Sequence, residues 1–177
     1  MGNAKTLYVK KILLLLLFFQ LSNLFGQNPN WNQSKVCNQV NLALKHIAED
    51  KIEKVKKVKL QDSINDGRNY DRLMVEYVAY KLNTDLEKVF DYSPEKTNLH
   101  FDKIEKASYT SFKLDSGCVK NIARKPNAYL SKLDDETLVI NIVTDNINTN
   151  EGASGVTYLF CFDGEKLIRV FKKHWIS

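Results

Sequence analysis

Two apolar segments that flank a tight turn near the C-terminus restrict the fold of this chain more than any other feature. Residues 155–162 and 165–176 are rich in β-branched and aromatic residues, and Asp163-Gly164 separates them. Asp-Gly favours the two-residue type I′ turn of a β-hairpin. A single hairpin is marginally stable in water, so further strands or helices must cover it. The segments therefore predict an antiparallel sheet at the C-terminus.

The predicted turn also determines which side chains share a face of the hairpin. Phe160 then pairs with Leu167, and Tyr158 pairs with Arg169. One face carries Val156, Tyr158, Phe160, Phe162, Leu167, Arg169, Phe171 and Trp175. Large exposed apolar patches are rare on monomeric proteins, so we expect Phe160, Leu167 and Phe171 in the main core. The candidate binding residues on this aromatic face are Tyr158, Phe160, Arg169, Phe171 and Trp175.

Apolar residues recur at helical spacing after a polar N-terminal stretch. The recurring positions are Val36, Val40, Leu44, Ile47, Val55 and Val58. Spacings of three, four and their sums are typical of one helix face, so the pattern predicts a long amphipathic helix over 35–58. Ser34 is the expected cap.

Residues 70–82 are apolar nearly all round, which suits either a buried helix or a two-sided strand. Leu, Met, Ala and Lys favour the helix. Thr84 to Glu87 has the spacing of a capping box and predicts a short helix to about Asp91. Ser93-Pro94 favours another helix start, but 92–106 stays unassigned between helix and strand.

Strand character returns after Ala107. Residues 109–114 alternate weakly, and 137–145 place Leu138, Ile140 and Ile142 on one face. The expected fold is α+β, with N-terminal helices packed on a C-terminal antiparallel, curved sheet in a single domain over 27–177. The helices cover one face of that sheet. The second face then requires curvature, a homodimer partner or contact with solvent.

The hairpin from Tyr158 to Phe171, with Asp163-Gly164 at its tip and His174-Trp175 at its end, resembles the closing hairpin of the nuclear-transport-factor-like and SnoaL-like cone folds. The resemblance covers about the last 25 residues. It implies N-terminal helices on a strongly curved antiparallel sheet, with a pocket or a dimer surface. It transfers no catalytic residue, and the early strand that such folds place between their helices is not evident in this sequence.

The first 26 residues have the pattern of a secretory signal peptide. Three lysines precede an apolar run from Ile12 to Phe19, and Gly26/Gln27 is the expected cleavage site. A spanning helix needs about 20 apolar residues, so the short run favours a cleaved signal over an uncleaved anchor. We expect a secreted or periplasmic domain that meets the membrane only during export.

The net charge argues against nucleic acid as a partner. It falls from +5 for the chain to +2 once the three leader lysines are removed. Nucleic-acid-binding domains are more strongly basic. Export permits disulfides, but the odd number of cysteines leaves at least one thiol free. Any one pairing among Cys37, Cys118 and Cys161, or none, fits the sequence.

Each catalytic pattern that we considered lacks a required element. His46, Glu49 and Asp50 share a helix face, yet a metal site needs ligands from elsewhere, and charge runs are usually solvated surface. Cys161 and His174 share a face in the predicted register but lie far apart along the hairpin, which favours a packed cysteine. We therefore predict no catalytic residue, no metal site and no cofactor.

Three functions stay open. The first is an exported, non-catalytic binding or interaction domain for a protein or a small apolar ligand. The second is an inhibitor or immunity-type protein for one cognate toxin or enzyme, acting through a charged exposed surface. The third is a small hydrolase with a cone-fold cleft, which requires acid–base groups that converge in one cleft.

Overall fold

The structure of the chain is a computed structural model. It describes residues 31–50, 57–107, 111–115, 117–119, 122–144 and 153–177, with the side chain of Asp66 excepted. The signal peptide predicted for 1–26 and most of the loop predicted for 146–154 lie outside the described residues.

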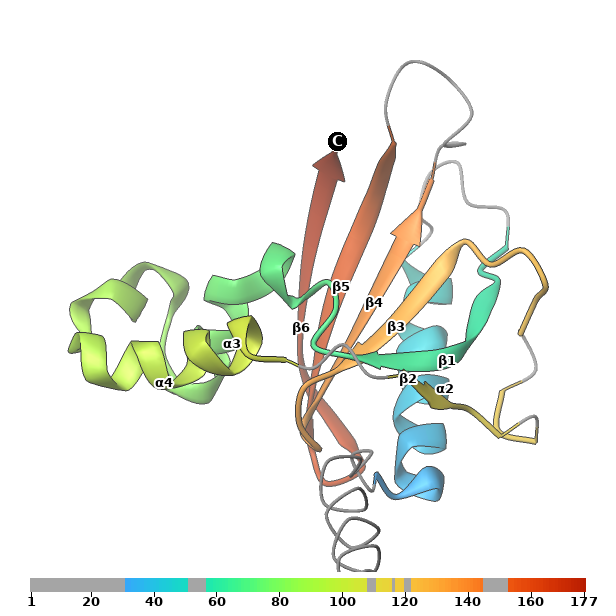
Figure 1. The fold of residues 1–177 in the computed structure, drawn as a ribbon, viewed down its shortest axis with the longest axis horizontal. Coiled ribbons are helices and arrows are strands. Elements are labelled where there is room, and N and C mark those ends of the chain that lie inside the picture. Colours follow the sequence, from blue (N-terminus) through green and yellow to red (C-terminus); the bar gives the residue numbers. More distant parts are fainter. Residues whose placement is uncertain (1–30, 51–56, 108–110, 116, 120–121, 145–152) are drawn as a thin grey trace, which may run out of the picture. The chain divides into compact units, whose positions relative to one another are not determined.

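The described residues form six strands and a set of helices, which confirms the α+β class (Figure 1). The strands are β1 Leu60–Asp66, β2 Ser111–Lys113, β3 Ala128–Lys132, β4 Thr137–Val143, β5 Ser154–Asp163 and β6 Lys166–Ile176. They form an open sheet in the order β2-β1-β3-β4-β5-β6. All neighbouring strands are antiparallel except β1 and β3, so the predicted antiparallel sheet is in fact mixed.

The long N-terminal helix is shorter than predicted. α2 spans Gln33–Glu49, and Asn32 caps it in place of Ser34 by accepting a hydrogen bond from Lys35 N at 3.2 Å. Residues 57–59, directly ahead of β1, are not helical. β1 lies in a segment for which the sequence analysis predicted no strand.

A helical insertion, defined as residues 67–107, connects β1 to β2. It contains η1 Tyr70–Leu73, α3 Met74–Lys81, η2 Leu86–Asp91 and α4 Pro94–Glu105. The helix predicted for 70–82 is confirmed, and 94–105 is helical as well. The two ends of the insertion meet at Gly67, where a Cβ would lie 2.0 Å from Cβ of Ala107. Gly67 also has φ +66°, a conformation that favours glycine, so both the backbone and the close contact disfavour a larger residue at this position.

Helices cover both faces of the sheet, and each face has its own core. α2 packs behind the sheet in Figure 1, against residues that include Leu130, Ile140 and Phe160. The helical insertion packs against the opposite face, where Val139, Leu159 and Cys161 meet Tyr70 and Tyr77. The sequence led us to expect helices on one face only. The insertion supplies the cover that we had assigned to curvature or a dimer partner.

The hairpin is paired differently from the prediction. Asp163 pairs with Lys166, so Gly164 and Glu165 form the two-residue loop, and Gly164 has φ +59°. Glycine at the first loop position is typical of a type II′ turn. A β-bulge follows directly. Phe162 pairs with Leu167, but Cys161 pairs with Arg169, so Ile168 is an extra residue in β6. The prediction that Asp163 and Gly164 form the turn was therefore wrong.

This bulge changes the face on which most of β6 lies. Before it, Leu167 shares the α2 side with Phe160. Beyond it, Phe171 pairs with Leu159 and packs in the core beneath the helical insertion. The prediction of one core for Phe160, Leu167 and Phe171 was right for the first two and wrong for Phe171. A bulge adds one residue to one strand, and the sequence pattern carries no sign of it.

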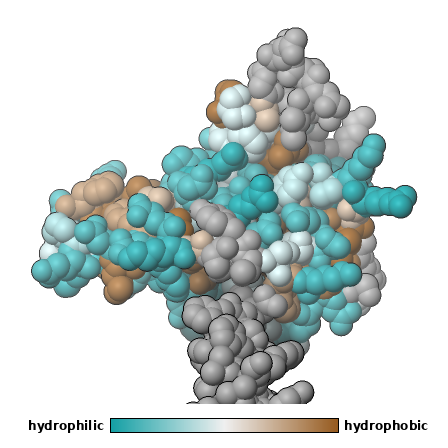
Figure 2. Space-filling view, in the orientation of Figure 1, coloured by the Kyte–Doolittle hydropathy of each residue, from teal (hydrophilic) through white to brown (hydrophobic). Residues whose placement is uncertain are grey.

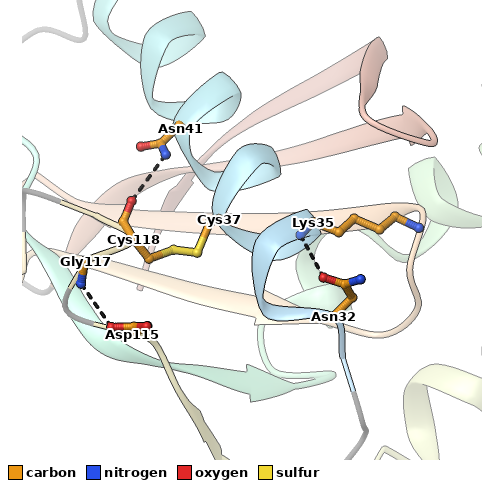
Figure 3. The surroundings of a disulfide bond; sticks show 7 residues. All are labelled: Asn32, Lys35, Cys37, Asn41, Asp115, Gly117 and Cys118. Atoms are coloured by element: carbon orange, nitrogen blue, oxygen red, sulfur yellow. Dashed lines mark hydrogen bonds between the residues drawn. A yellow bond between two sulfur atoms is a disulfide. The ribbon is translucent and has the colours of Figure 1, made fainter.

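A disulfide joins Cys37 on α2 to Cys118 in the loop after β2 (Figure 3). The two Cα atoms are 5.2 Å apart, within the usual range for a disulfide. Asn41, one helical turn beyond Cys37, donates to the carbonyl oxygen of Cys118 at 3.2 Å. Cys161 is a buried free thiol. The structure thus selects one of the pairings that the sequence left open.

Candidate functional site

The sheet surface opposite α2 carries several buried polar side chains. We call this surface the polar face. Its buried members are Ser63 and Asn65 on β1, Ser131 on β3, Thr137 and Asn141 on β4 and Thr157 on β5. They share one side because strand residues alternate and pair in register: Asn65 lies beside Ser131, and Asn141 beside Thr157. Burying polar groups is costly unless they are hydrogen-bonded.

Asn141 is the centre of the polar face. Its Oδ1 accepts hydrogen bonds from Thr157 Oγ1 at 2.7 Å, from Trp175 Nε1 at 2.9 Å and from Arg72 Nη1 at 3.3 Å. The donors come from β5, β6 and η1, so the helical insertion and two strands converge on one amide. Such a network orients each donor strongly, since three elements hold it together.

The Trp175 indole packs against a glycine, Gly155, on the neighbouring strand. A Cβ at Gly155 would lie 2.3 Å from Trp175 Cζ2 and 2.3 Å from the carbonyl oxygen of Ile142. Gly155 therefore makes room for the indole. The guanidinium carbon of Arg72 lies 3.8 Å from the centre of the indole ring, in a cation–π contact.

We expect Gly155→Ala to displace the Trp175 indole and to lower the free energy of unfolding by about 1–3 kcal/mol, the usual cost of overpacking. The indole N–H resonance of Trp175 and a denaturation curve measure the two effects. Gly117→Ala is the matched control, because among the described residues its Cβ would contact only Asp115 Oδ1, at 3.8 Å. An unchanged Trp175 resonance would contradict the arrangement.

Two amide atoms on or beside the polar face are buried without a partner among the described residues. Asn65 Nδ2 has none, and the whole residue is only 6% exposed. Gln61 Oε1 has none either, although Gln61 Nε2 donates to Ser63 Oγ at 2.7 Å. Buried donors that lack a partner are rare in folded proteins and are of interest for that reason.

Arg72 has a charge but no carboxylate partner among the residues that the structure describes. Its guanidinium contacts the neutral Asn141 amide and the Trp175 ring. The nearby acid Glu76 forms an ion pair with Lys173, with Oε1 and Nζ 3.7 Å apart. Lys173 lies opposite Thr157, at the same level of the sheet as Asn141. The polar face therefore holds a cation that is fixed in position and not neutralised.

A second cluster, around Asp134, connects the helical insertion to the turn between β3 and β4. Asp134 accepts hydrogen bonds from Tyr77 at 2.9 Å and from Thr137 at 2.7 Å, and Lys81 Nζ lies 2.8 Å away. Burial raises the pKa of the Asp134 carboxyl, but Lys81 outweighs burial, and the pKa falls to about 2. A carboxylate that is fully bonded and permanently ionised is suited to holding two elements together, and not to proton transfer.

Lys132 is a buried amine on the α2 side of the sheet. It is 1% exposed, and its Nζ donates to Gln39 Oε1 at 2.6 Å. Burial lowers the pKa of Lys132 to about 8, although Asp134 and Asp135 oppose the shift. The carbonyl oxygen of Asp135 also accepts a hydrogen bond from Gln39 at 2.9 Å.

We expect the wild type to become more stable as the pH rises above about 8, and Lys132→Met to abolish this rise. Above about pH 8 the folded lysine loses its proton while the unfolded lysine, with its ordinary pKa near 10.4, retains it. The unfolded state then binds more protons, so the wild type gains stability between about pH 8 and pH 10. Denaturation across this window should show the gain in the wild type and in the exposed-lysine control Lys113→Met. If the stability of Lys132→Met rose with pH as steeply as that of the wild type, the rise could not be due to Lys132.

The predicted binding residues are divided between the two faces. Tyr158 and Phe160 are completely buried on the α2 side, where Tyr158 donates a hydrogen bond to Asp50 Oδ2 at 2.5 Å. Arg169, Phe171 and Trp175 lie on the other side because of the bulge. Arg169 is exposed, with its guanidinium 5.1 Å from the Phe171 ring. Of the five, Trp175 is hydrogen-bonded to Asn141.

Sequence reasoning missed Arg72, Asn141, Thr157 and Asn65. A signal was present for two of them. Asn141 and Thr157 are polar residues within strongly apolar strands, at positions that alternate with core residues. Polar residues at such positions on a buried strand indicate a second face with a role of its own. Nothing local to Arg72 or Asn65 indicates where they lie, because both depend on the helical insertion and on the unpredicted β1.

The described residues that could carry acid–base or metal chemistry are dispersed. No group of three or more His, Cys, Asp and Glu side chains among them could hold a metal ion. Burial raises the pKa of the Cys161 thiol to about 12, which disfavours the reactive thiolate. His174 pairs with Val156 and thus lies on the opposite face from Cys161. Asp50 forms an ion pair with Lys172 at 2.8 Å.

No family model, curated protein or solved structure was found to match this chain. The resemblance of the hairpin to the nuclear-transport-factor-like and SnoaL-like folds therefore stays a prediction. In the part of the chain that the structure describes, no helix is long and apolar enough to cross a membrane.

Proposed function

We propose that this protein is an exported, non-catalytic binding domain that holds a ligand with polar groups against the polar face. The observation that carries the proposal is the set of buried polar side chains on one sheet face, with Asn65 Nδ2 unpartnered and Arg72 without a counter-ion among the described residues. Apolar residues would stabilise that face at lower cost. Convergent, oriented polar groups are typical of binding sites.

The earlier expectation of a small apolar ligand depended on an aromatic face. Tyr158 and Phe160 are completely buried beneath α2, whereas Arg72 and Trp175 beside the polar face keep part of their surface exposed. The polar face is the stronger candidate, and a ligand with hydrogen-bonding groups matches its donors and acceptors better.

Ligand screening by two-dimensional NMR tests the proposal. A true ligand is expected to shift the side-chain amide resonances of Asn65 and Asn141 and the indole resonance of Trp175. Thr157→Val, which replaces the hydroxyl by a methyl group and removes its hydrogen bond to Asn141, should weaken binding, whereas Asn98→Leu on the exposed surface of α4 should not. Ligands whose shifts fall elsewhere on the molecule would overturn the proposal.

Exposed apolar residues favour the inhibitor or immunity-type protein as a second candidate. Leu86, Phe90 and Leu99 are 41%, 71% and 69% exposed on η2 and α4. In Figure 2 the helical insertion carries apolar patches between its charged residues. Exposed apolar surface of this kind often marks a protein contact. Loss of a co-purifying protein in Phe90→Ser, but not in the exposed polar variant Asn98→Ser, would support it.

We expect the protein to be exported with loss of its leader, because the lysines and the short apolar run of 1–26 have the order of a signal peptide. N-terminal sequencing of protein from the native host should start at Gln27. A cytoplasmic chain that still begins near Met1 would contradict export without affecting the ligand proposal.

A further inference from the structure

We propose that Arg72 is the specificity-determining residue of the polar face and binds an oxyanion, a carboxylate or phosphate group carried by the ligand. The proposal rests on the proposed function, since it names the ligand class of the same face. It stands on the geometry around Arg72, on the charges near it and on the donors that it keeps free.

Among the described residues, the groups that hold the guanidinium of Arg72 in place are neutral. Asn141 Oδ1 accepts from Nη1 at 3.3 Å, and Trp175 supports one side of the planar group at 3.8 Å. Those supports are themselves fixed, because Trp175 donates to the same oxygen at 2.9 Å and packs against Gly155. An arginine positioned by a second layer of contacts is already oriented for a ligand, which lowers the entropic cost of binding.

The contacts of Arg72 leave most of its donors free. A guanidinium has five N–H groups in a planar fork, and Asn141 is the acceptor that the described residues provide. The fork matches the paired oxygens of a carboxylate or phosphate, so two parallel hydrogen bonds can form. A neutral ligand would use these donors less well.

The charges nearby also favour an anion. Arg72 and Lys173 are cations close to Asn141, and Glu76 is the acid that the structure places with them, 3.7 Å from Lys173. One positive charge is therefore left without compensation among the described residues. On the same face, but two strands away from Asn141, the amide nitrogen of Asn65 is a buried donor that lacks an acceptor among the described residues. The other oxygen of Glu76, Oε2, is buried without a hydrogen-bond partner among the described residues and opposes an anion, so the proposal depends on the uncompensated charge and the free donors of Arg72.

A packing role for Arg72 is the main alternative. Arginine stacks on tryptophan in many proteins with no ligand involved. Under that alternative, Arg72→Gln would lower the stability of the protein and leave its affinity for anions unchanged. Binding and stability must therefore be measured separately.

The experiment uses the protein as it accumulates in its native host, titrated with inorganic phosphate and with succinate, and with chloride at equal ionic strength as the control. We expect one of the two oxyanions to produce saturable shifts in the Arg72 side-chain and Trp175 indole resonances. Arg72→Gln should weaken binding about tenfold or more, the effect of losing a charged hydrogen bond. Arg68→Gln, at an exposed arginine four residues earlier, should bind as the wild type does.

Arg72→Lys keeps the charge and loses the fork, so intermediate binding is expected; this variant also decides the matter if Arg72→Gln does not fold. Equal shifts with chloride, or unchanged binding in both Arg72 variants, would overturn the oxyanion proposal. A neutral ligand that shifts Asn65, Asn141 and Trp175 alike in the wild type and Arg72→Gln would overturn it too, yet leave the proposed binding function intact.

Discussion

Phe160→Ala is expected to lower the free energy of unfolding by about 3–5 kcal/mol. Phe160 has no exposed surface and lies in the core between α2 and the sheet. Its ring stacks on Tyr158 with centroids 5.7 Å apart, and the His46 ring meets it edge-on at 5.8 Å. Truncation would remove these contacts and leave a cavity, because close-packed neighbours relax only in part.

Phe90→Ala is the matched control for Phe160→Ala. It deletes the same side chain at a position that is 71% exposed, so its stability should stay within about 0.5 kcal/mol of the wild type. Chemical denaturation of the two variants side by side makes the comparison. A similar effect at both positions would mean that the packing between α2 and β5 is not as described.

Replacing both Cys37 and Cys118 by alanine is expected to lower the free energy of unfolding by about 2–5 kcal/mol. The bond joins residues 81 positions apart, and the enclosed chain includes β1, the whole helical insertion and β2. Closing so long a loop removes much entropy from the unfolded chain. The bond also holds α2 against the loop after β2, where Asn41 adds a hydrogen bond.

Denaturation with and without reductant measures the disulfide effect. The wild type under reducing conditions should match the double variant, and the variant should not respond to reductant. Cys161→Ala is the control, because the buried Cys161 thiol takes no part in the bond. A non-reducing peptide map that joins Cys161 to either partner would contradict the assignment.

The strongly apolar segments could be predicted from the sequence. β4 and β5 alternate or run apolar over seven and ten residues, and α2 repeats its apolar positions at helical spacing. In these elements the spacing of the apolar residues indicates which side of the helix or strand faces the core. The type of each element and its buried side were therefore predictable, even where an end was misplaced by several residues.

β1 and β3 could not be recognised in the same way. β1 reads LQDSIND, in which Leu60 and Ile64 are the apolar residues, and β3 reads AYLSK. Both strands present buried polar residues to the polar face, so neither has the apolar run of a central strand. The polar residues of the candidate site thus interrupt the apolar pattern by which β1 and β3 could have been recognised in the sequence.

The sequence by itself determined that the chain would be α+β, that its apolar strands would end in a hairpin near Gly164 and that Phe160 would be buried. These properties depend on residues close together in the chain, whose spacing expresses the periodicity of each element. The tertiary structure alone decided the Cys37–Cys118 pairing, the bulge that moves Phe171 to the other face, and the meeting of Arg72, Asn141 and Trp175. Each of those joins distant segments, and a one-residue change of register reverses which face a side chain occupies.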